Sequence, residues 1–282
     1  MKKIVSLLLV LVLACTTLFA LASCSKDVEI GVQAGTTGQY FVDGDEDWGF
    51  DGIAGYASKG YSNGGLAVND MKNGAVKYVM IDEQPAKELE KKIEGIKVID
   101  IALTEEEYAF GVDKAQTELL TAVNLILTEM KLTGKLNEIV AAYATGEGIA
   151  PFESATFDEN KTATQLVVAT NANFAPFEYK DGDKFAGIDM EIAKYIADKL
   201  GMELVIRDME FDAVVESVGK NGVDIAMAGL TVNETRKLSV DFSDSYYEAA
   251  QMLIVPASET AFDNCKTSDD VLAVLAAKLE EK

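Results

Sequence analysis

The chain has 282 residues, of which 49% are hydrophobic, and its 47 acidic against 25 basic residues give a formal net charge of −22. This acidity argues against binding to nucleic acid or anionic lipid, and the complete lack of histidine argues against a zinc site or a histidine-dependent hydrolase. The length allows one large or two modest folded domains, and no metal or cofactor is expected.

The first 23 residues have the layout of a cleavable secretory signal peptide. Lys2 and Lys3 precede a long apolar run, and small residues follow the run directly before Cys24. The run is also long enough to span a membrane, but the small residues favour cleavage. The tetrapeptide that ends in Cys24 resembles a bacterial lipobox, which implies lipidation of the Cys24 thiol and anchoring through two acyl chains. We therefore expect an extracytoplasmic lipoprotein, held at the outer face of the cytoplasmic membrane or in the periplasm.

Short strand-like runs alternate with helical patterns from residue 28 onward. In the first half, strands are expected at 28–33, 76–81, 96–101 and 108–112, and helices at 66–72, 85–93, 117–132 and 136–143. Residues 146–164 are polar, contain Pro151 and have few periodic apolar positions, so they are expected to form a linker.

The alternation resumes after the linker. Strands are expected at 165–170, 203–207, 224–228 and 251–255, and helices at 188–200, 212–218 and 268–279. The helix over 188–200 has isoleucine or leucine at every fourth position and is followed by Gly201, a residue type that commonly ends helices. This pattern predicts α/β layers around mostly parallel sheets, in which ligands bind at the carboxyl ends of the strands.

Several ordered motifs stand in such loops and helix starts. They are Asn171–Tyr179, with the sequence Asn-Ala-Asn-Phe-Ala-Pro-Phe-Glu-Tyr, the segments 187–194, 211–212, 222–236 and 240–247, and, earlier in the chain, 31–38 and 78–86. The later series resembles the first lobe of the family 3 extracellular solute-binding proteins, and the two earlier segments resemble the second lobe. The resemblance covers nearly the whole mature chain. It implies a two-lobed, hinged periplasmic-binding-protein-like fold of type II that binds polar amino acids.

The two lobes stand in an unusual order. In the family, the lobe with the Phe-Ala-Pro-Phe-Glu motif comes first, whereas here the Gly-Thr-Thr-Gly segment of the other lobe precedes it. The resemblance therefore implies a circular permutation, in which the linker 146–164 joins the usual C- and N-termini. Lobe one would comprise residues 103–247, and lobe two residues 25–102 together with 248–282.

Arg236 is the residue expected to hold the carboxylate of a bound amino acid. A guanidinium offers a fixed fork of donors that matches a carboxylate bidentately. After the leader, Arg207 and Arg236 are the only arginines in the chain. The alternative for Arg236 is a surface ion pair with Glu234 or Asp241.

The resemblance adds further groups for both poles of the ligand. Thr231, Thr36 and Thr37 would donate to the carboxylate, with helix capping as the alternative role. Asp82 would accept from the ammonium, together with the carbonyl of Gly229. The alternative for Asp82 is to cap the helix that follows it.

Four residues match positions that contact the ligand's side chain in the family. Phe174 and Phe211 would cover it with aromatic faces, which suit aliphatic, amide or cationic groups. The alternative for both rings is core packing. Asn171 and Gln33 would tune specificity, and because Asn171 is neutral where members that prefer basic ligands often have an acid, a basic ligand is put in doubt without being excluded.

The function implied by the resemblance is that of a binding protein, not an enzyme. A free L-amino acid would bridge the lobes of a monomer and favour closure, and the permease of an ABC transporter would recognise the closed form. Two alternatives stay open: a ligand-sensing lipoprotein, and an enzyme like the cyclohexadienyl dehydratases. The enzyme would need a catalytic acid in the cleft, for which Glu178 and Asp212 are the nearby candidates.

Overall fold

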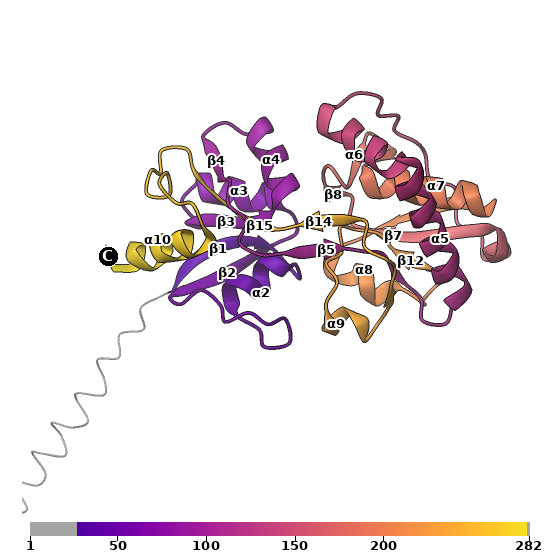
Figure 1. Cartoon of the computed structure of the whole chain (residues 1–282), viewed down its shortest axis with the longest axis horizontal. Coiled ribbons are helices and arrows are strands. Elements are labelled where there is room, and N and C mark those ends of the chain that lie inside the picture. The colour runs from indigo at the N-terminus through magenta and orange to yellow at the C-terminus, as the bar shows by residue number, and fades with distance from the viewer. Residues whose placement is uncertain (1–26, 281–282) are drawn as a thin grey trace, which may run out of the picture.

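The computed structural model describes residues 27–280, so the expected signal peptide and Cys24 lie outside the described residues. The described chain folds into two α/β lobes joined by extended strands, as Figure 1 shows. The two-lobed α/β fold expected from the sequence is confirmed. Between residues 27 and 280, no helix is both long enough and apolar enough to cross a membrane.

The lobe that contains the first described strand, here called lobe two, is built on a five-stranded sheet with the order β2-β1-β3-β15-β4. Its strands are β1 (Val28–Gln33), β2 (Tyr56–Tyr61), β3 (Tyr78–Asp82), β4 (Ile96–Ile99) and β15 (Gln251–Pro256). The first three strands run parallel, whereas β15 lies antiparallel between β3 and β4. A strand from late in the chain therefore completes the sheet that the earliest strands begin.

Four helices flank this sheet: α2 (Thr37–Asp43), α3 (Gly64–Lys72), α4 (Glu83–Lys92) and α10 (Ser268–Glu280). Sequence periodicity predicts neither α2 nor β2. Helix α2 has few apolar residues to form a stripe, and the edge strand β2 is largely polar. Pairing of β2 with β1 along its whole length supplies the register that its own residues do not encode.

Lobe one is built on a second five-stranded sheet, with the order β11-β7-β12-β6-β13. Its strands are β6 (Gly111–Val112), β7 (Gln165–Thr170), β11 (Glu203–Asp208), β12 (Ile225–Ala226) and β13 (Asp241–Phe242). A small antiparallel sheet joins β8 (Asn173–Phe174), β9 (Glu178–Asp181) and β10 (Lys184–Ala186). Strand β12 is shorter than the predicted run 224–228, because pairing on both sides is confined to Ile225 and Ala226.

The helices of lobe one are α5 (Thr117–Thr133), α6 (Lys135–Thr145), α7 (Ile188–Leu200), α8 (Phe211–Ser217) and α9 (Glu234–Lys237). Two predicted helix ends are confirmed. Gly134 separates α5 from α6 with φ +79°, and Gly201 ends α7 with φ +68°. Both values lie in the left-handed region, which glycine adopts at little cost.

The segment 146–164 packs on lobe one more closely than its polar composition predicts. Phe152 exchanges two backbone hydrogen bonds with Phe185, at 3.0 and 2.8 Å, and the Ala155 N–H donates to the carbonyl of Leu204 at 2.9 Å. The segment ends in the 3-10 turn Thr162–Thr164, directly before β7. It therefore runs along lobe one between α6 and β7.

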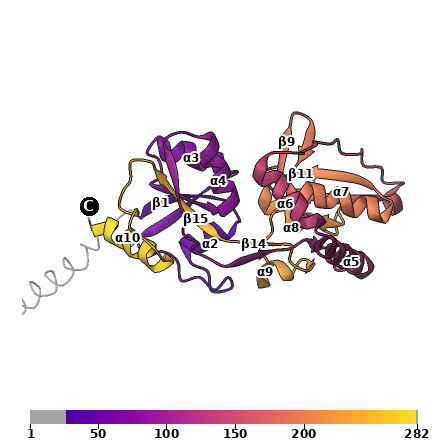
Figure 2. The same ribbon diagram turned by 45° about the horizontal axis from the view of Figure 1, so that its top comes forward.

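Two short strands connect the lobes: β5 (Glu106–Tyr108) and β14 (Tyr247–Ala249), which pair antiparallel. Figure 2 shows β14 passing from one lobe toward the other. The predicted strand 108–112 is divided here, because its first part lies in β5 and its last part, β6, belongs to the sheet of lobe one. The crossover region therefore lies beside the facing surfaces of both lobes.

Candidate functional site

The expected ligand residues of lobe two gather at one edge of its sheet. Gln33 ends β1, Thr36 and Thr37 stand at the start of α2, and Asp82 ends β3. Strands β1 and β3 are parallel neighbours, so their carboxyl ends meet at the same edge. This is the edge at which ligands bind in α/β sheets.

The expected residues of lobe one come from five of its segments. Asn171 follows β7, Phe174 lies in β8, Phe211 begins α8, Thr231 follows β12, and Arg236 lies in α9. Three hydrogen bonds connect the lobes at this place, two of them between members of the two sets. The Gln33 side-chain amide donates to Asn171 at 3.1 Å, the Thr37 hydroxyl donates to Thr231 at 3.1 Å, and Arg236 donates to the carbonyl of Gly35 at 3.2 Å.

Arg236 is buried, with 8% of its surface exposed. Its guanidinium donates to the carbonyl of Thr231 at 2.8 Å as well as to Gly35 of the other lobe. Among the described residues no carboxylate forms an ion pair with it, so the surface pair with Glu234 or Asp241 is not made. Burial lowers the pKa of Arg236 to about 10, although the charges of nearby carboxylates favour its protonation. A buried, protonated guanidinium is suited to receive an anion.

Two aromatic rings flank the Arg236 guanidinium. Its central carbon lies 5.3 Å from the ring centre of Phe211 in lobe one and 5.1 Å from that of Trp48 in lobe two. Trp48 also stacks on Tyr40 at 4.2 Å. The sequence gives no indication of this contact, because nothing in the local pattern around Trp48 shows that it meets an arginine of the other lobe. Cation–π contacts of this kind hold the guanidinium plane.

Asp82 stands at the N-cap position of α4, but its side chain makes no capping bond. Instead the hydroxyl of Tyr108, from the crossover strand β5, donates to its carboxylate. Burial raises the pKa of Asp82 to about 7, and the charge of Glu106 adds to the effect. The capping alternative is therefore wrong, and Asp82 lies with its carboxylate against the crossover.

The threonines are likewise not ordinary caps. Thr36 holds the N-cap position of α2 without a capping bond and donates to the carbonyl of Gln33 at 2.8 Å. The Thr231 hydroxyl accepts from Thr37 and donates to the carboxylate of Glu106 at 2.6 Å. Glu106 was not among the expected residues, because its membership of the site depends on the position of β5.

Phe174 and Gly229 are in close contact. Gly229 has φ +53°, and a Cβ atom placed on it would lie 3.0 Å from the Phe174 ring and 3.2 Å from the Tyr108 ring. The Gly229 N–H donates to Asp189 at 2.9 Å. Glycine at this position therefore lets the Phe174 ring approach the backbone.

Asp189 and Glu178 are buried acids behind these residues. Asp189 accepts from the Gly229 N–H and from the Tyr246 hydroxyl, and burial raises its pKa to about 7. Both carboxyl oxygens of Glu178 are buried without a hydrogen-bond partner, and burial raises the pKa of Glu178 well above its usual range. Asp212, the other candidate acid of an enzyme, is exposed on α8. The two acids are thus in different environments.

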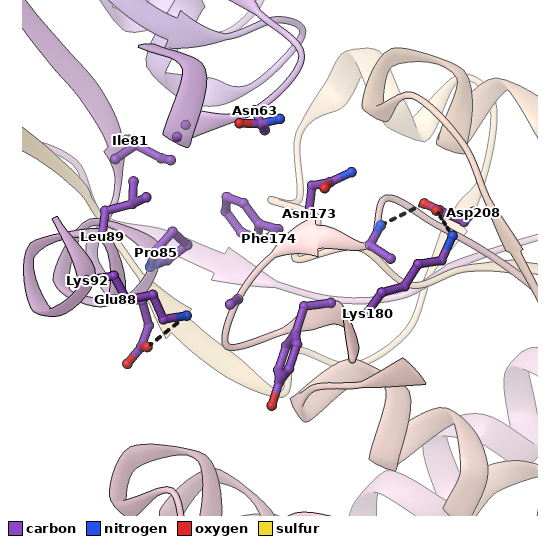
Figure 3. Close-up of a pocket in the computed structure, with 15 residues that line it drawn as sticks. Asn63, Ile81, Pro85, Glu88, Leu89, Lys92, Asn173, Phe174, Lys180 and Asp208 are labelled. Carbon is purple, nitrogen blue, oxygen red and sulfur yellow. Dashed lines mark hydrogen bonds and ion pairs between the residues drawn. The ribbon is translucent and has the colours of Figure 1, made fainter. Parts of the chain in front are cut away.

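A cavity of about 550 Å³ lies between the lobes beside Phe174 (Figure 3). Lobe two lines it with residues of α3, β3 and α4, and lobe one with β8, β9 and the end of β11. Two ion pairs border it, Lys180 with Asp208 at 2.6 Å and Lys92 with Glu88 at 3.6 Å. Its volume is in the range that small-molecule sites occupy.

The later part of the chain matches a known protein family. Residues 166–281 match the model of bacterial extracellular solute-binding proteins, family 3. The arginine-binding extracellular protein ArtP of Bacillus subtilis is 41% identical over 90 residues, which are 32% of this chain and 35% of that protein. A probable histidine-binding protein of Neisseria gonorrhoeae is 32% identical over 105 residues, or 37% of this chain and 38% of that protein.

Solved structures are similar over part of the chain. The arginine-bound form of truncated ArgBP from T. maritima is 41% identical with a TM-score of 0.30, and the match covers 32% of this chain and 43% of that one. Domain 1 of TmArgBP, bound to arginine, is 33% identical with a TM-score of 0.30, covering 43% of this chain and 99% of that one. The chain spans about a third to a half of the curated relatives it matches. The matched region, residues 166–281, belongs to the family 3 bacterial extracellular solute-binding proteins.

Proposed function

We propose that this protein binds one free polar amino acid between its lobes and delivers it to the permease of an ABC importer. The observation that carries the proposal is the buried Arg236, which lies between two aromatic rings and donates to backbone carbonyls of both lobes. Among the described residues no carboxylate bonds this guanidinium directly, and a buried cation is stabilised by a directly bonded anion. A ligand carboxylate is the partner that we assign to it.

The second pole of the ligand is its ammonium. We assign Asp82 and the carbonyl of Gly229 to it, and the Thr37 hydroxyl to the carboxylate beside Arg236. The side chain would pass Phe174 and enter the cavity between the lobes. The relatives named for arginine and histidine indicate cationic ligands as the first to test, whereas the neutral Asn171, which already bonds Gln33 and the carbonyl of Met209, favours no particular charge.

Binding would act through the hinge formed by β5 and β14. A ligand can enter only when the lobes separate, which breaks the bonds of Gln33 to Asn171 and of Thr37 to Thr231. A bound amino acid would replace them with charge-assisted bonds to both lobes and so favour closure. A dissociation constant near a micromolar corresponds to about −8 kcal/mol. The permease would recognise the closed form, with the protein held at the membrane by a lipid on Cys24.

The circular permutation is part of the proposal. The family match begins at residue 166, in the sheet of lobe one, and runs through β15 and α10. The segment 146–164 joins two elements of the same lobe. The described ends of the chain also lie near each other, because Leu279 packs on Gly55, whose carbonyl accepts from the N–H of Val28. These contacts support an order in which the old termini were joined and new ones opened in lobe two.

Isothermal titration of the protein with the proteinogenic L-amino acids and L-cystine tests the proposed function. We expect one or a few ligands to bind with micromolar or tighter affinity, and Arg236→Ala to weaken binding about 100-fold or more. Arg207→Ala is the matched control, because Arg207 stacks on Phe157 away from the site and its loss should leave affinity unchanged. Absence of binding by a folded wild-type sample would contradict the amino-acid assignment.

A further inference from the structure

Glu106 lies in the crossover strand β5 and faces the site. Only 8% of its surface is exposed, whereas its neighbours Glu105 and Glu107 are exposed, as alternation along a strand requires. Tyr108 lies on the same face two residues later and donates to Asp82. One short strand therefore presents both a carboxylate and the hydroxyl that contacts the expected ammonium-binding acid.

Three donors from different elements converge on the Glu106 carboxylate. They are the hydroxyl of Thr104 at 2.6 Å, the side-chain amide of Gln251 at 3.0 Å, and the hydroxyl of Thr231 at 2.6 Å. Glu106 is thus used only as an acceptor. The backbone of Gln251 is paired with that of Asp82, so the Gln251 side chain brings the two acids into one neighbourhood.

These bonds decide what the Thr231 hydroxyl can offer to a ligand. A hydroxyl has one proton, and that of Thr231 is donated to Glu106, while the oxygen already accepts from Thr37. The remaining capacity of Thr231 is therefore as an acceptor. This differs from the sequence-based expectation that the Thr231 hydroxyl donates to the ligand carboxylate. Thr37, in contrast, can turn its proton to that carboxylate once the lobes part.

We propose that Glu106 is a specificity-determining residue, which holds Thr231 as an acceptor and places a second carboxylate beside Asp82, so that the site selects ligands with an α-ammonium. This proposal rests on the proposed function. When both are ionised, Asp82 and Glu106 place two negative charges near the one positive charge of the buried Arg236, and an α-ammonium favours this ionised state. A carboxylic acid that lacks the ammonium leaves this excess unbalanced and the Thr231 oxygen without a donor, so it binds poorly.

The test compares each ligand with its analogue that lacks the amino group. The purified protein is titrated with the proteinogenic L-amino acids and L-cystine, and then with the deamino analogue of the tightest of them. We expect Glu106→Gln to weaken the affinity for the amino acid about 10- to 100-fold, because Thr231 loses its charged acceptor and Asp82 loses the second carboxylate beside it. The affinity for the deamino analogue should change by no more than about twofold. Glu107→Gln, on the exposed face of the same strand, is the control and should leave both affinities unchanged.

A general loss of structure in Glu106→Gln can be told apart from this outcome, because it would weaken the affinities for the amino acid and for its deamino analogue equally. Equal weakening, or a Glu106→Gln protein with wild-type selectivity, would overturn the role of Glu106 while leaving the proposed function in place. Failure of the wild-type protein to bind any amino acid would overturn both. Thr231→Val keeps the test decisive if Glu106→Gln does not fold, because removing the hydroxyl should reduce the affinity for the amino acid and spare the analogue.

Discussion

At the scale of single residues, the site depends on polar groups buried with few partners. Arg236 has backbone carbonyls and two aromatic faces around it, and Asp82 and Asp189 each receive a tyrosine hydroxyl. Desolvation of each group disfavours its charged form, which explains the direction of all three pKa shifts. Such groups make the folded protein sensitive to pH and to small changes in packing.

Gly229→Ala tests the packing. The added Cβ would meet the Phe174 ring at 3.0 Å, at a backbone φ of +53°. We expect a loss of about 1–3 kcal/mol in the free energy of unfolding from overpacking and strain, together with weaker ligand binding. Gly182→Ala is the control for strain alone, because its φ is +62° and no atom lies within 4 Å of the added Cβ. Urea denaturation gives the free energy of unfolding of both variants. Equal losses in Gly229→Ala and Gly182→Ala would contradict the proposed contact with Phe174.

Asp189 makes stability depend on pH. Its pKa is raised from 3.8 to about 7 by burial, so between these values the folded protein keeps a proton that the unfolded chain has lost. The free energy of unfolding is therefore expected to fall as pH rises from about 4 to 7. Asp189→Asn should reduce this fall in the free energy of unfolding by on the order of 2–4 kcal/mol, and the contributions of Asp82 and Glu178, whose pKa values are also raised, should remain.

Denaturation at several pH values between about 4 and 8 measures this slope. Asp183→Asn, an exposed acid in the turn between β9 and β10, serves as the control and should keep the wild-type slope. An Asp189→Asn protein with an unchanged slope would show that Asp189 does not carry the titration.

At the scale of elements, very short segments position the site. Helix α9 has only four residues, and the side chain of its N-cap, Asn233, accepts from the backbone N–H of Arg236 at 2.8 Å. Strand β5 has three residues and supplies Glu106 and Tyr108. Elements of this length have little stability of their own, so their caps and pairings hold the functional side chains in place.

Asn233→Ala is expected to weaken ligand binding as well as stability. Loss of the cap costs about 1 kcal/mol in the free energy of unfolding and frees the turn that carries Arg236. Asn233→Ser retains a capping oxygen and should bind nearly as the wild type does. Titration calorimetry of both variants gives the comparison, and identical affinities for the alanine and serine variants would show that the cap does not position Arg236.

At the scale of the whole molecule, lobe two is built from two separate parts of the chain, and lobe one lies between them in the sequence. Strand β15 enters lobe two from late in the chain and pairs with both β3 and β4, while the long segment between β4 and β15 includes lobe one. The lobes are joined through β5 and β14, whose antiparallel pairing makes a compact hinge. Relative motion of the lobes therefore requires changes at only a few backbone positions.

The proposed permutation predicts that a chain with its two lobes in the order usual for the family keeps the same fold. A protein that starts near residue 160, runs to residue 280, continues through a short added linker to residue 27 and ends near residue 150 should fold and bind the same ligand. The contacts of Leu279 with Gly55, and of Gly55 with Val28, favour a short linker. Circular dichroism and titration calorimetry test this, and failure to fold with linkers of several lengths would contradict the proposal.

The sequence by itself determined the alternation of strands and helices, the helix ends at Gly134 and Gly201, and the family that residues 166–281 match. These are local properties, because periodicity and left-handed glycines act within a few residues. Its motifs also contain Arg236, Asp82 and Thr37, which the structure brings to facing surfaces of the lobes.

Only the tertiary structure decided which residues meet them. Glu106 bonds a threonine 125 positions away, and the Tyr108 hydroxyl reaches Asp82 across 26 positions. Trp48 reaches Arg236 from the other lobe. The polar strand β2 likewise depends on its pairing with β1. These contacts arise from the way the crossover strands place one lobe against the other, and because that placement is a long-range property, no local pattern encodes it.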